Sequence, residues 1–220
     1  MSNTDYPTAR PFIPDQQNLE NLSEAAAGCK GCPLYREATQ TVFGEGPDDA
    51  ALMLVGEQPG QREDRTGHPF RGPAGKVLNR VLSEAGLNRE ELYITNAVKH
   101  LKFESDGGRR QAQTPMVDEI EACHPWIESE LNTVQPRVVV ALGTVAARSL
   151  LGQSVAISES IDAWMQTRHG QALLVTYHPT AAIRASTGAD RDRIFDAIAR
   201  SLNRANKALS TGGSGTRPQP

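Results

Sequence analysis

The segment LMLVGEQPGQREDRTGHPFRGPAG, residues 52–75, decides which fold the rest of the sequence has to complete. It begins with a short apolar run, breaks at Gly56 and continues as a stretch rich in glycine, proline and charge. Beyond Gly72, apolar residues recur at helical spacing at Val77, Leu78, Val81, Leu82 and Ala85. A crossover loop usually needs only about two to six residues. An irregular loop of roughly fifteen residues between a strand and a helix therefore predicts a site at the carboxyl end of that strand.

Strands and helices are expected to alternate along the rest of the chain. Apolar runs predict strands at residues 51–55, 92–97, 137–142 and 173–177, with helices between them. This alternation predicts an α/β fold of three α/β/α layers around a central, mostly parallel, four-stranded sheet. Composition divides the chain into a flexible N-terminal segment (1–17), a single domain (18–204) and a disordered tail (205–220).

Composition limits the classes of function. The 220 residues carry a net charge of −3, with a pI near 6.0, so no overall basic field indicates a nucleic-acid partner. This argues against a histone-like binder, although an enzyme with a local basic groove remains compatible. No apolar run approaches the roughly 18 residues that span a bilayer, and the N-terminus lacks the features of a signal peptide. We expect a soluble, cytoplasmic monomer without a membrane partner.

Three cysteines, Cys29, Cys32 and Cys123, form the first candidate site. An odd, small number argues against a disulfide framework and leaves metal binding or simple burial. The pair is spaced as CxxC, Cys123 lies on a predicted helix, and His100 follows a predicted strand. Such a set of side chains can supply the ligands of a metal ion or of an iron–sulfur cluster. From spacing alone, a buried Cys123 with a separate CxxC turn is an equally good interpretation.

Polar residues at strand ends form the second candidate site. Glu57 and Gln58 follow the first strand, Asn96 ends the second and His178 follows the fourth. The carboxyl ends of parallel strands meet at one edge, so these side chains are expected to share a crevice suited to a small molecule or a base. Phe70 lies in an otherwise polar loop. Its ring either packs into the hydrophobic core or provides a surface on which the ring of a ligand stacks.

The third candidate is the stretch 99–114, which is polar, broken by glycine and predicted to be a loop. It carries basic residues, including Arg109 and Arg110, against several acidic ones. A solvated surface loop and a phosphate-contacting loop are both compatible with this small excess of charge.

Together these motifs resemble the uracil-DNA glycosylase superfamily in its iron–sulfur branch, comprising family 4 and the UdgX-type proteins. The resemblance covers about residues 29–202. It rests on CKGCPLYR (29–36), GEQPG (56–60), GHPFRGPAG (67–75), TNAVK (95–99), EACHPW (121–126) and HPTAAIR (178–184). Gln58 in the second motif matches the UdgX type, whereas family 4 usually has GEAPG.

The resemblance implies a role for each matched residue. It implies a [4Fe–4S] cluster held by Cys29, Cys32, His100 and Cys123, with His100 where family 4 has a cysteine. It implies catalysis by Glu57 and His178, and uracil binding by Gln58, Phe70 and Asn96. It also implies contacts between DNA phosphates and Arg109, Arg110 and Arg184. The expected partner is uracil-containing DNA, single-stranded by preference and double-stranded as an alternative.

Two departures from the family pattern bear on mechanism. UdgX-type proteins carry a loop of the form KRRIHKTP, whose histidine attacks the sugar and leaves the protein attached to DNA. Here the loop is GRRQAQTP, with Ala112 at the histidine position. Gln61 stands where the related motif usually has Asp or a small residue, which affects water placement or base discrimination.

The resulting prediction is a non-covalent uracil-DNA glycosylase that releases uracil and turns over. Two alternatives come from other classes of function. One is a uracil-DNA-binding protein with little or no turnover, and the other is an iron–sulfur protein of unrelated function on the same fold.

Overall fold

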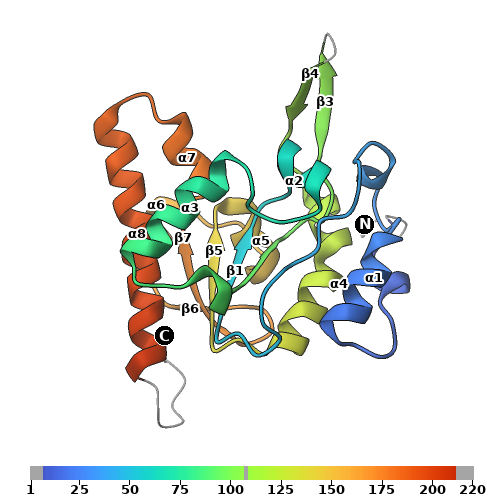
Figure 1. Cartoon of the computed structure of the whole chain (residues 1–220), viewed down its shortest axis with the longest axis horizontal. Helices are drawn as coiled ribbons and strands as arrows, with labels where there is room; N and C mark the ends of the chain where they lie inside the picture. The colour runs from blue at the N-terminus through green and yellow to red at the C-terminus, as the bar shows by residue number, and fades with distance from the viewer. Residues whose placement is uncertain (1–6, 107–108, 212–220) are drawn as a thin grey trace.

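A computed structural model describes residues 7–106 and 109–211 and contains a central five-stranded sheet (Figure 1). Its strand order is β2-β1-β5-β7-β6. The strands are β1 (Leu52–Gly56), β2 (Tyr93–Asn96), β5 (Val138–Leu142), β6 (Met165–Gln166) and β7 (Ala172–Thr176). The four longer strands are parallel, and β6 pairs antiparallel with β7 at one edge. The predicted number of four strands was wrong because β6, with two residues, is too short to produce a periodic pattern.

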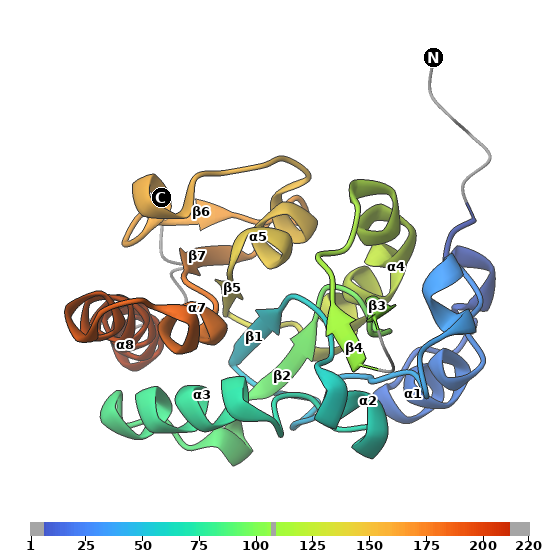
Figure 2. The ribbon, with the colours of Figure 1, turned by 90° about the horizontal axis from the view of Figure 1, so that it is seen from above.

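Helices cover both faces of the sheet, which confirms the predicted three-layer α/β/α architecture (Figure 2). One face carries α3 (Pro73–Glu84), α7 (Pro179–Arg184) and α8 (Gly188–Thr211). The other carries α4 (Val117–Val134) and α5 (Thr144–Leu151), with α1 (Leu19–Ala27) packed against α4. The remaining helical turns are η1 (Arg10–Phe12), η2 (Pro33–Arg36), η3 (Arg89–Glu91), α2 (Gln61–Thr66) and α6 (Ile157–Ser160).

The apolar runs form strands because both of their faces are buried. In β1, Leu52 and Leu54 pack toward α3 and α8, whereas Met53 and Val55 pack toward α4 and α5. Successive side chains of a strand point to opposite faces, so a strand between two helical layers is apolar at most positions. All residues of β1, β2, β5 and β7 are buried.

The stretch predicted to be a loop at 99–114 instead contains a two-stranded antiparallel hairpin. Its strands are β3 (Phe103–Asp106) and β4 (Arg109–Ala112), and it projects beyond the sheet (Figure 1). Charged and polar residues oppose each other in the pairs Glu104↔Gln111 and Ser105↔Arg110. Because the hairpin lacks an alternating apolar face, hydrophobic periodicity gave no signal for it.

The long loop after β1 is not irregular throughout, since it contains α2. This helix has a polar sequence, and buried acceptors anchor it. The Asp64 carboxylate accepts from the Thr39 backbone N–H (2.8 Å), and Glu63 Oε1 accepts from the Gly72 N–H (2.6 Å). Hydrogen bonds of this kind hold a helix in place without an apolar stripe, which explains why periodicity did not reveal it.

The described parts of the two terminal segments, residues 7–17 and 205–211, are more ordered than the sequence predicted. Ala9 is buried and its N–H donates to the Ala122 carbonyl of α4 (2.8 Å), so part of the segment 1–17 is docked on the domain. Residues 205–211, expected in the tail, continue α8, and Ala205 is fully buried. Residues 1–6 and 212–220 lie outside the described part of the chain.

Within the described ranges, no helix combines the length and the apolar character needed to cross a membrane.

Replacement of Ala205 by aspartate tests whether this part of α8 belongs to the domain. Ala205→Asp places an uncompensated carboxylate in the core, which we expect to lower the free energy of unfolding by about 3–5 kcal/mol. Urea denaturation measures the change. Arg204→Asp, at the adjacent exposed position, is the control and should change stability by no more than about 0.5 kcal/mol. Equal effects of the two variants would contradict the burial of Ala205.

Candidate active site

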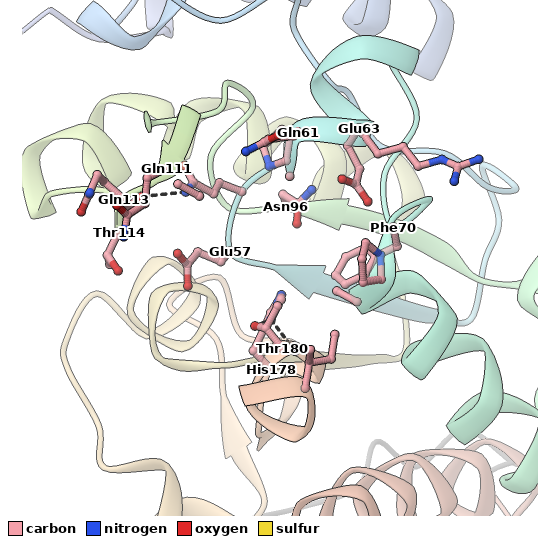
Figure 3. Close-up of a pocket in the computed structure, with 18 of the residues that line it drawn as sticks. Glu57, Gln61, Glu63, Phe70, Asn96, Gln111, Gln113, Thr114, His178 and Thr180 are labelled. Carbon is pink, nitrogen blue, oxygen red and sulfur yellow. Dashed lines mark hydrogen bonds between the residues drawn. The ribbon is translucent and has the colours of Figure 1, made fainter. Parts of the chain in front are cut away.

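A pocket of about 960 Å³ opens at the carboxyl edge of the sheet (Figure 3). Four residues singled out from the sequence line it together: Glu57, Phe70, Asn96 and His178. They come from the ends of three parallel strands and from the loop before α3. The register Gly56↔Asn96 aligns the ends of β1 and β2, which brings Glu57 and Asn96 to the same edge.

Asn96 presents an unsatisfied acceptor to this site. Its side chain is 2% exposed, and among the described residues its Oδ1 has no hydrogen-bond partner. Leaving a buried carbonyl unpaired costs about 1–3 kcal/mol. Because Asn96 lines the pocket, a ligand with an N–H donor is the natural partner for this oxygen.

Phe70 has a backbone conformation that is rare for an aromatic residue. Its φ is +54°, in the left-handed region, at a typical cost of about 1–3 kcal/mol. The flanking backbone is held on both sides, because Arg89 Nη2 donates to the Pro69 carbonyl (2.9 Å) and Glu63 accepts from the Gly72 N–H. The ring is buried and lines the pocket, with its centroid 5.9 Å from that of His178.

Hydrogen bonding fixes the protonation pattern of His178. Its Nδ1 accepts from the Thr180 N–H at the start of α7, so this nitrogen carries no proton in the neutral ring. Burial, with a smaller contribution from Arg184, lowers the pKa of His178 from 6.5 to about 4. The imidazole is therefore neutral near pH 7, with its proton on Nε2, and it can act as a hydrogen-bond donor in the pocket.

Glu57 lies half-buried on the same wall. Burial raises the pKa of its carboxyl group, and the positive charge of Arg184 opposes that effect. Arg184 itself is exposed and lines the pocket at the end of α7. One flexible cation therefore acts electrostatically on both Glu57 and His178.

Gln58 and Gln61 hold the hairpin against the pocket. Gln58 Nε2 donates to the Gln113 carbonyl (2.7 Å), and its Oε1 accepts from the Lys102 N–H (2.8 Å). Gln61 Nε2 donates to the Arg110 carbonyl. Gln58 was predicted to bind a base, and it does line the pocket, but its amide is engaged by both ends of the hairpin.

Arg110, predicted as a phosphate contact, is engaged within the protein. Its Nη1 donates to the buried Asp64 carboxylate (3.0 Å), and its guanidinium lies 4.3 Å from the centroid of the Phe103 ring. The side chain of Arg109 lies outside the described part of the structure. Ala112, at the end of β4, is exposed and lines the pocket.

Sequence reasoning did not identify three supporting residues of this site. Glu63 lines the pocket and anchors the backbone after Phe70, Asp64 binds Arg110, and Thr180 orients the His178 ring. Glu63 and Asp64 stand among other charged residues in the sequence, so only their burial distinguishes them. Thr180, two residues after His178, is a signal that could have been recognised as a helix-start contact.

Cys29, Cys32, His100 and Cys123 are all buried, away from this pocket. N–H groups surround their sulfur atoms: Trp126 Nε1 donates to Cys29 Sγ and the Lys99 N–H to Cys123 Sγ, both at 3.3 Å. Burial raises the pKa of Cys32 to about 11 and that of Cys123 to about 12, and the three thiols influence one another electrostatically. Across residues 7–106 and 109–211, no group of three or more such side chains is arranged to hold a single metal ion.

The tautomer of His100 also follows from its contacts. The Thr41 hydroxyl donates its proton to the Ala26 carbonyl (2.9 Å), so its oxygen accepts from His100 Nε2–H (2.9 Å). This leaves Nδ1 with a free lone pair, and burial lowers the pKa of the ring to about 4. A neutral imidazole whose other nitrogen is hydrogen-bonded is the usual state of a metal ligand.

A pH dependence of stability follows from the lowered pKa of His178. Between pH 6.5 and about 4, the unfolded imidazole binds a proton that the folded one does not. The contribution of this residue is therefore complete above pH 6.5 and is lost as the pH falls toward 4, by up to about 1.4 kcal/mol per pH unit. We expect urea denaturation to show the wild-type chain losing stability relative to His178→Gln over this interval. A stability difference that is constant with pH would contradict the assignment.

Comparison with known proteins places the chain in a family. Residues 43–203 match the sequence model of the uracil DNA glycosylase superfamily. The chain is 34% identical over 170 residues to the type-4 uracil-DNA glycosylase of Thermotoga maritima, covering 77% of this chain and 85% of that protein. It is 34% identical over 174 residues to the type-4 enzyme of Pyrobaculum aerophilum (76% and 85%), and 29% identical to the type-5 enzyme of that organism (71% and 74%). The protein whose strand ends form this pocket therefore belongs to the uracil DNA glycosylase superfamily.

Proposed function

We propose that this chain is a uracil-DNA glycosylase that hydrolyses the bond between uracil and deoxyribose in DNA and then releases both products. The family and the type-4 relatives support the activity. The main support for uracil as the base is Asn96 Oδ1, which has no hydrogen-bond partner among the described residues. Asn96 lines the pocket together with Phe70 and His178. A base in a duplex is inaccessible to such a pocket, so the nucleotide enters flipped out or from a single strand.

Asn96 is the proposed reader of the base. Its Oδ1 accepts from N3–H of uracil, and its amide nitrogen donates to O4. Cytosine presents an acceptor at N3 and a donor at C4, so it would leave both groups mismatched inside a buried site. The Phe70 ring stacks on the base, and Gln58 bounds the same space while its amide holds the hairpin.

The neutral Nε2–H of His178 supplies the stabilisation of the leaving group. When the glycosidic bond breaks, its electron pair goes to uracil, whose negative charge spreads onto O2. A fixed N–H donor beside O2 stabilises that charge, and fixed donors are most effective where water is excluded. The Thr180 N–H keeps the ring in the tautomer that this requires.

Glu57 acts on the sugar. The departing base leaves an oxocarbenium-like sugar, which a nearby carboxylate stabilises electrostatically. Glu57 also orients the water that attacks C1′ and accepts its proton. Arg184, exposed at the mouth of the pocket, binds a DNA phosphate, with Arg109 as a second proposed contact. Arg110 contributes through the position of the hairpin, since Asp64 engages its guanidinium.

With alanine at position 112, we propose that water, and not a side chain of the hairpin, attacks the sugar. A methyl group on the pocket wall cannot attack C1′, so no bond forms between this position and the sugar. We propose turnover by a monomer in the cytoplasm, on single-stranded DNA by preference and on double-stranded DNA as an alternative.

The four buried ligands are proposed to hold a [4Fe–4S] cluster. Their donor chemistry fits: three thiols lie among N–H donors, and His100 has a free Nδ1. When bound, the cluster would supply the positive charge that stabilises the thiolates. Cys29 and Cys32 would then join the stretch after α1 to α4, which carries Cys123.

The activity is tested with single-stranded DNA that contains one uracil. We expect free uracil and alkali-labile abasic sites, and no protein–DNA band that survives denaturation. Asn96→Ala should lower the single-turnover rate by about tenfold to a hundredfold, because it removes base contacts from a buried site. Binding of this DNA without release of uracil would favour the alternative of a uracil-DNA-binding protein.

Ala112→His is the matched variant for the non-covalent step. It restores a nucleophile on the pocket wall without changing the rest of the hairpin, so a denaturation-resistant adduct should form with this variant alone. An adduct with the wild-type chain would contradict the role proposed for Ala112.

Loss of a cluster ligand should remove iron and stability together. We expect anaerobically purified Cys123→Ser to lose most of its bound iron and its visible absorbance, and its melting temperature should fall. Ile127→Val, one turn later on the buried side of α4, is the control, with a cost of about 0.5–1.5 kcal/mol and full iron content. Wild-type protein without iron after anaerobic purification would contradict the proposed cofactor.

A further inference from the structure

A fully buried ion pair lies between the proposed cluster ligands and the base pocket. Lys99 Nζ and Glu130 Oε2 are 2.6 Å apart, and both side chains are 0% exposed. Lys99 directly precedes the proposed ligand His100, and Glu130 lies on α4, two turns after Cys123. Neither residue lines the pocket, and the proposed reaction assigns no role to either of them.

Every polar atom of this pair has a partner. The Lys99 ammonium donates to Glu130 Oε2, to Thr95 Oγ1 (2.6 Å) and to the Asn96 carbonyl (3.0 Å). Glu130 Oε1 accepts from the Tyr93 hydroxyl (3.0 Å) and from the Thr95 hydroxyl (2.9 Å). Three of these partners belong to β2, so the pair binds the end of that strand to α4.

Stability is a weak explanation for such a pair. The free-energy cost of removing two charges from water is about as large as the gain from their attraction. Replacement of a buried ion pair by well-packed neutral residues therefore often leaves the stability of a protein unchanged. A buried network that satisfies all its groups does, however, permit a single arrangement of the elements it joins. The arrangement fixed here is that of residues 95–96 relative to α4.

The main chain of Lys99 extends the connection to the proposed cluster. Its N–H donates to Cys123 Sγ (3.3 Å), and its Nζ donates to the Asn96 carbonyl. One residue thus contacts a proposed iron ligand at one end and the base-reading residue at the other. Asn96 Oδ1 has no partner of its own among the described residues, so the backbone determines where it points.

We propose that Lys99, together with Glu130, is a positioning residue that holds Asn96 for recognition of the base and couples it to the helix that carries Cys123. This rests on the proposed function, in which Asn96 reads uracil. It predicts that neutralising the pair weakens recognition of the base specifically, while the fold and binding to the DNA backbone persist.

The test compares Lys99→Met/Glu130→Gln with Asn96→Ala and with the triple variant. The double variant removes both charges together and keeps an acceptor for Tyr93 and Thr95. Affinity is measured for single-stranded DNA carrying 2′-fluoro-deoxyuridine, whose glycosidic bond resists cleavage, and for the same DNA with a tetrahydrofuran abasic site. The ratio of the two dissociation constants isolates the contribution of the base.

We expect the double variant to keep its iron content and its affinity for abasic DNA. Its preference for the uracil probe over the abasic probe should fall about tenfold, because misplacement of a contacting group is costly. The triple variant should match Asn96→Ala alone, since residues that act through one contact are not additive. A ratio unchanged in the double variant, or losses that multiply in the triple variant, would overturn the proposal.

Two further variants complete the design. Lys102→Met is the matched control, because Lys102 also pairs with α4, through Glu119 (2.9 Å). In the described part of the chain the Lys102 side chain makes no hydrogen bond to Asn96, so the ratio for this variant should equal that of the wild type. If the double variant does not fold, Thr95→Val takes its place. It removes one acceptor of Lys99, and a twofold to threefold loss that disappears in the Asn96→Ala background supports the proposal, while no loss refutes it.

Because the 2′-fluoro probe is bound but not cleaved, it tests the role of Lys99 in base recognition independently of the proposed hydrolysis. A wild-type chain that prefers the fluorinated uracil probe but releases no uracil from ordinary DNA would refute hydrolysis, and the cycle of variants would still decide the role of Lys99. A wild-type chain without preference for the base would refute both.

Discussion

The close approach of three chain segments at Gly56 is the constraint on which the pocket depends. A Cβ atom at this position would lie 2.4 Å from Asn96 Oδ1 and 2.5 Å from Cζ of Phe70. The end of β1 must therefore lack a side chain for the amide of β2 and the Phe70 ring to meet there. Gly75 serves the same loop, since a Cβ there would lie 1.8 Å from the Phe70 carbonyl oxygen. The register Gly56↔Asn96 then brings Glu57 and Asn96 to the same edge of the sheet.

The pocket contains two unfavourable features that the surrounding structure sustains. Within the described part of the chain, the buried side-chain carbonyl of Asn96 has no hydrogen-bond partner, and Phe70 occupies a left-handed backbone conformation. Such features persist only where neighbouring contacts leave no alternative, and they concentrate at binding sites. Here Arg89 and Glu63 hold the backbone around Phe70, while the Lys99–Glu130 pair holds the end of β2. The polar network behind the pocket therefore holds the proposed base-contacting groups in place before a base binds.

Sequence patterns predicted the parts of the fold that burial determines. The runs that became β1 and β5 carry no polar side chain, and β7 is apolar up to Thr176. Because parallel strands end at one edge of the sheet, their positions also predicted that Glu57, Asn96 and His178 would lie together, and all three line the pocket. The hairpin and α2 escaped prediction because hydrogen bonds and ion pairs hold them, and these leave no period in the sequence, whereas β6 is too short to show one. For the same reason, the sequence did not reveal that Gln58 and Arg110 are engaged within the protein.

The hairpin has a role that does not depend on a nucleophile. Gln58 and Gln61 bind its backbone, and Asp64 binds Arg110, so three side chains from one stretch after β1 hold it against the pocket. Two of these hydrogen bonds are partly buried, and together they fix the position of the hairpin relative to the stretch after β1. With Ala112 on the pocket wall, what the hairpin still provides is enclosure. Exclusion of water strengthens every interaction on which the proposed mechanism relies, from the Nε2–H of His178 to the carboxylate of Glu57.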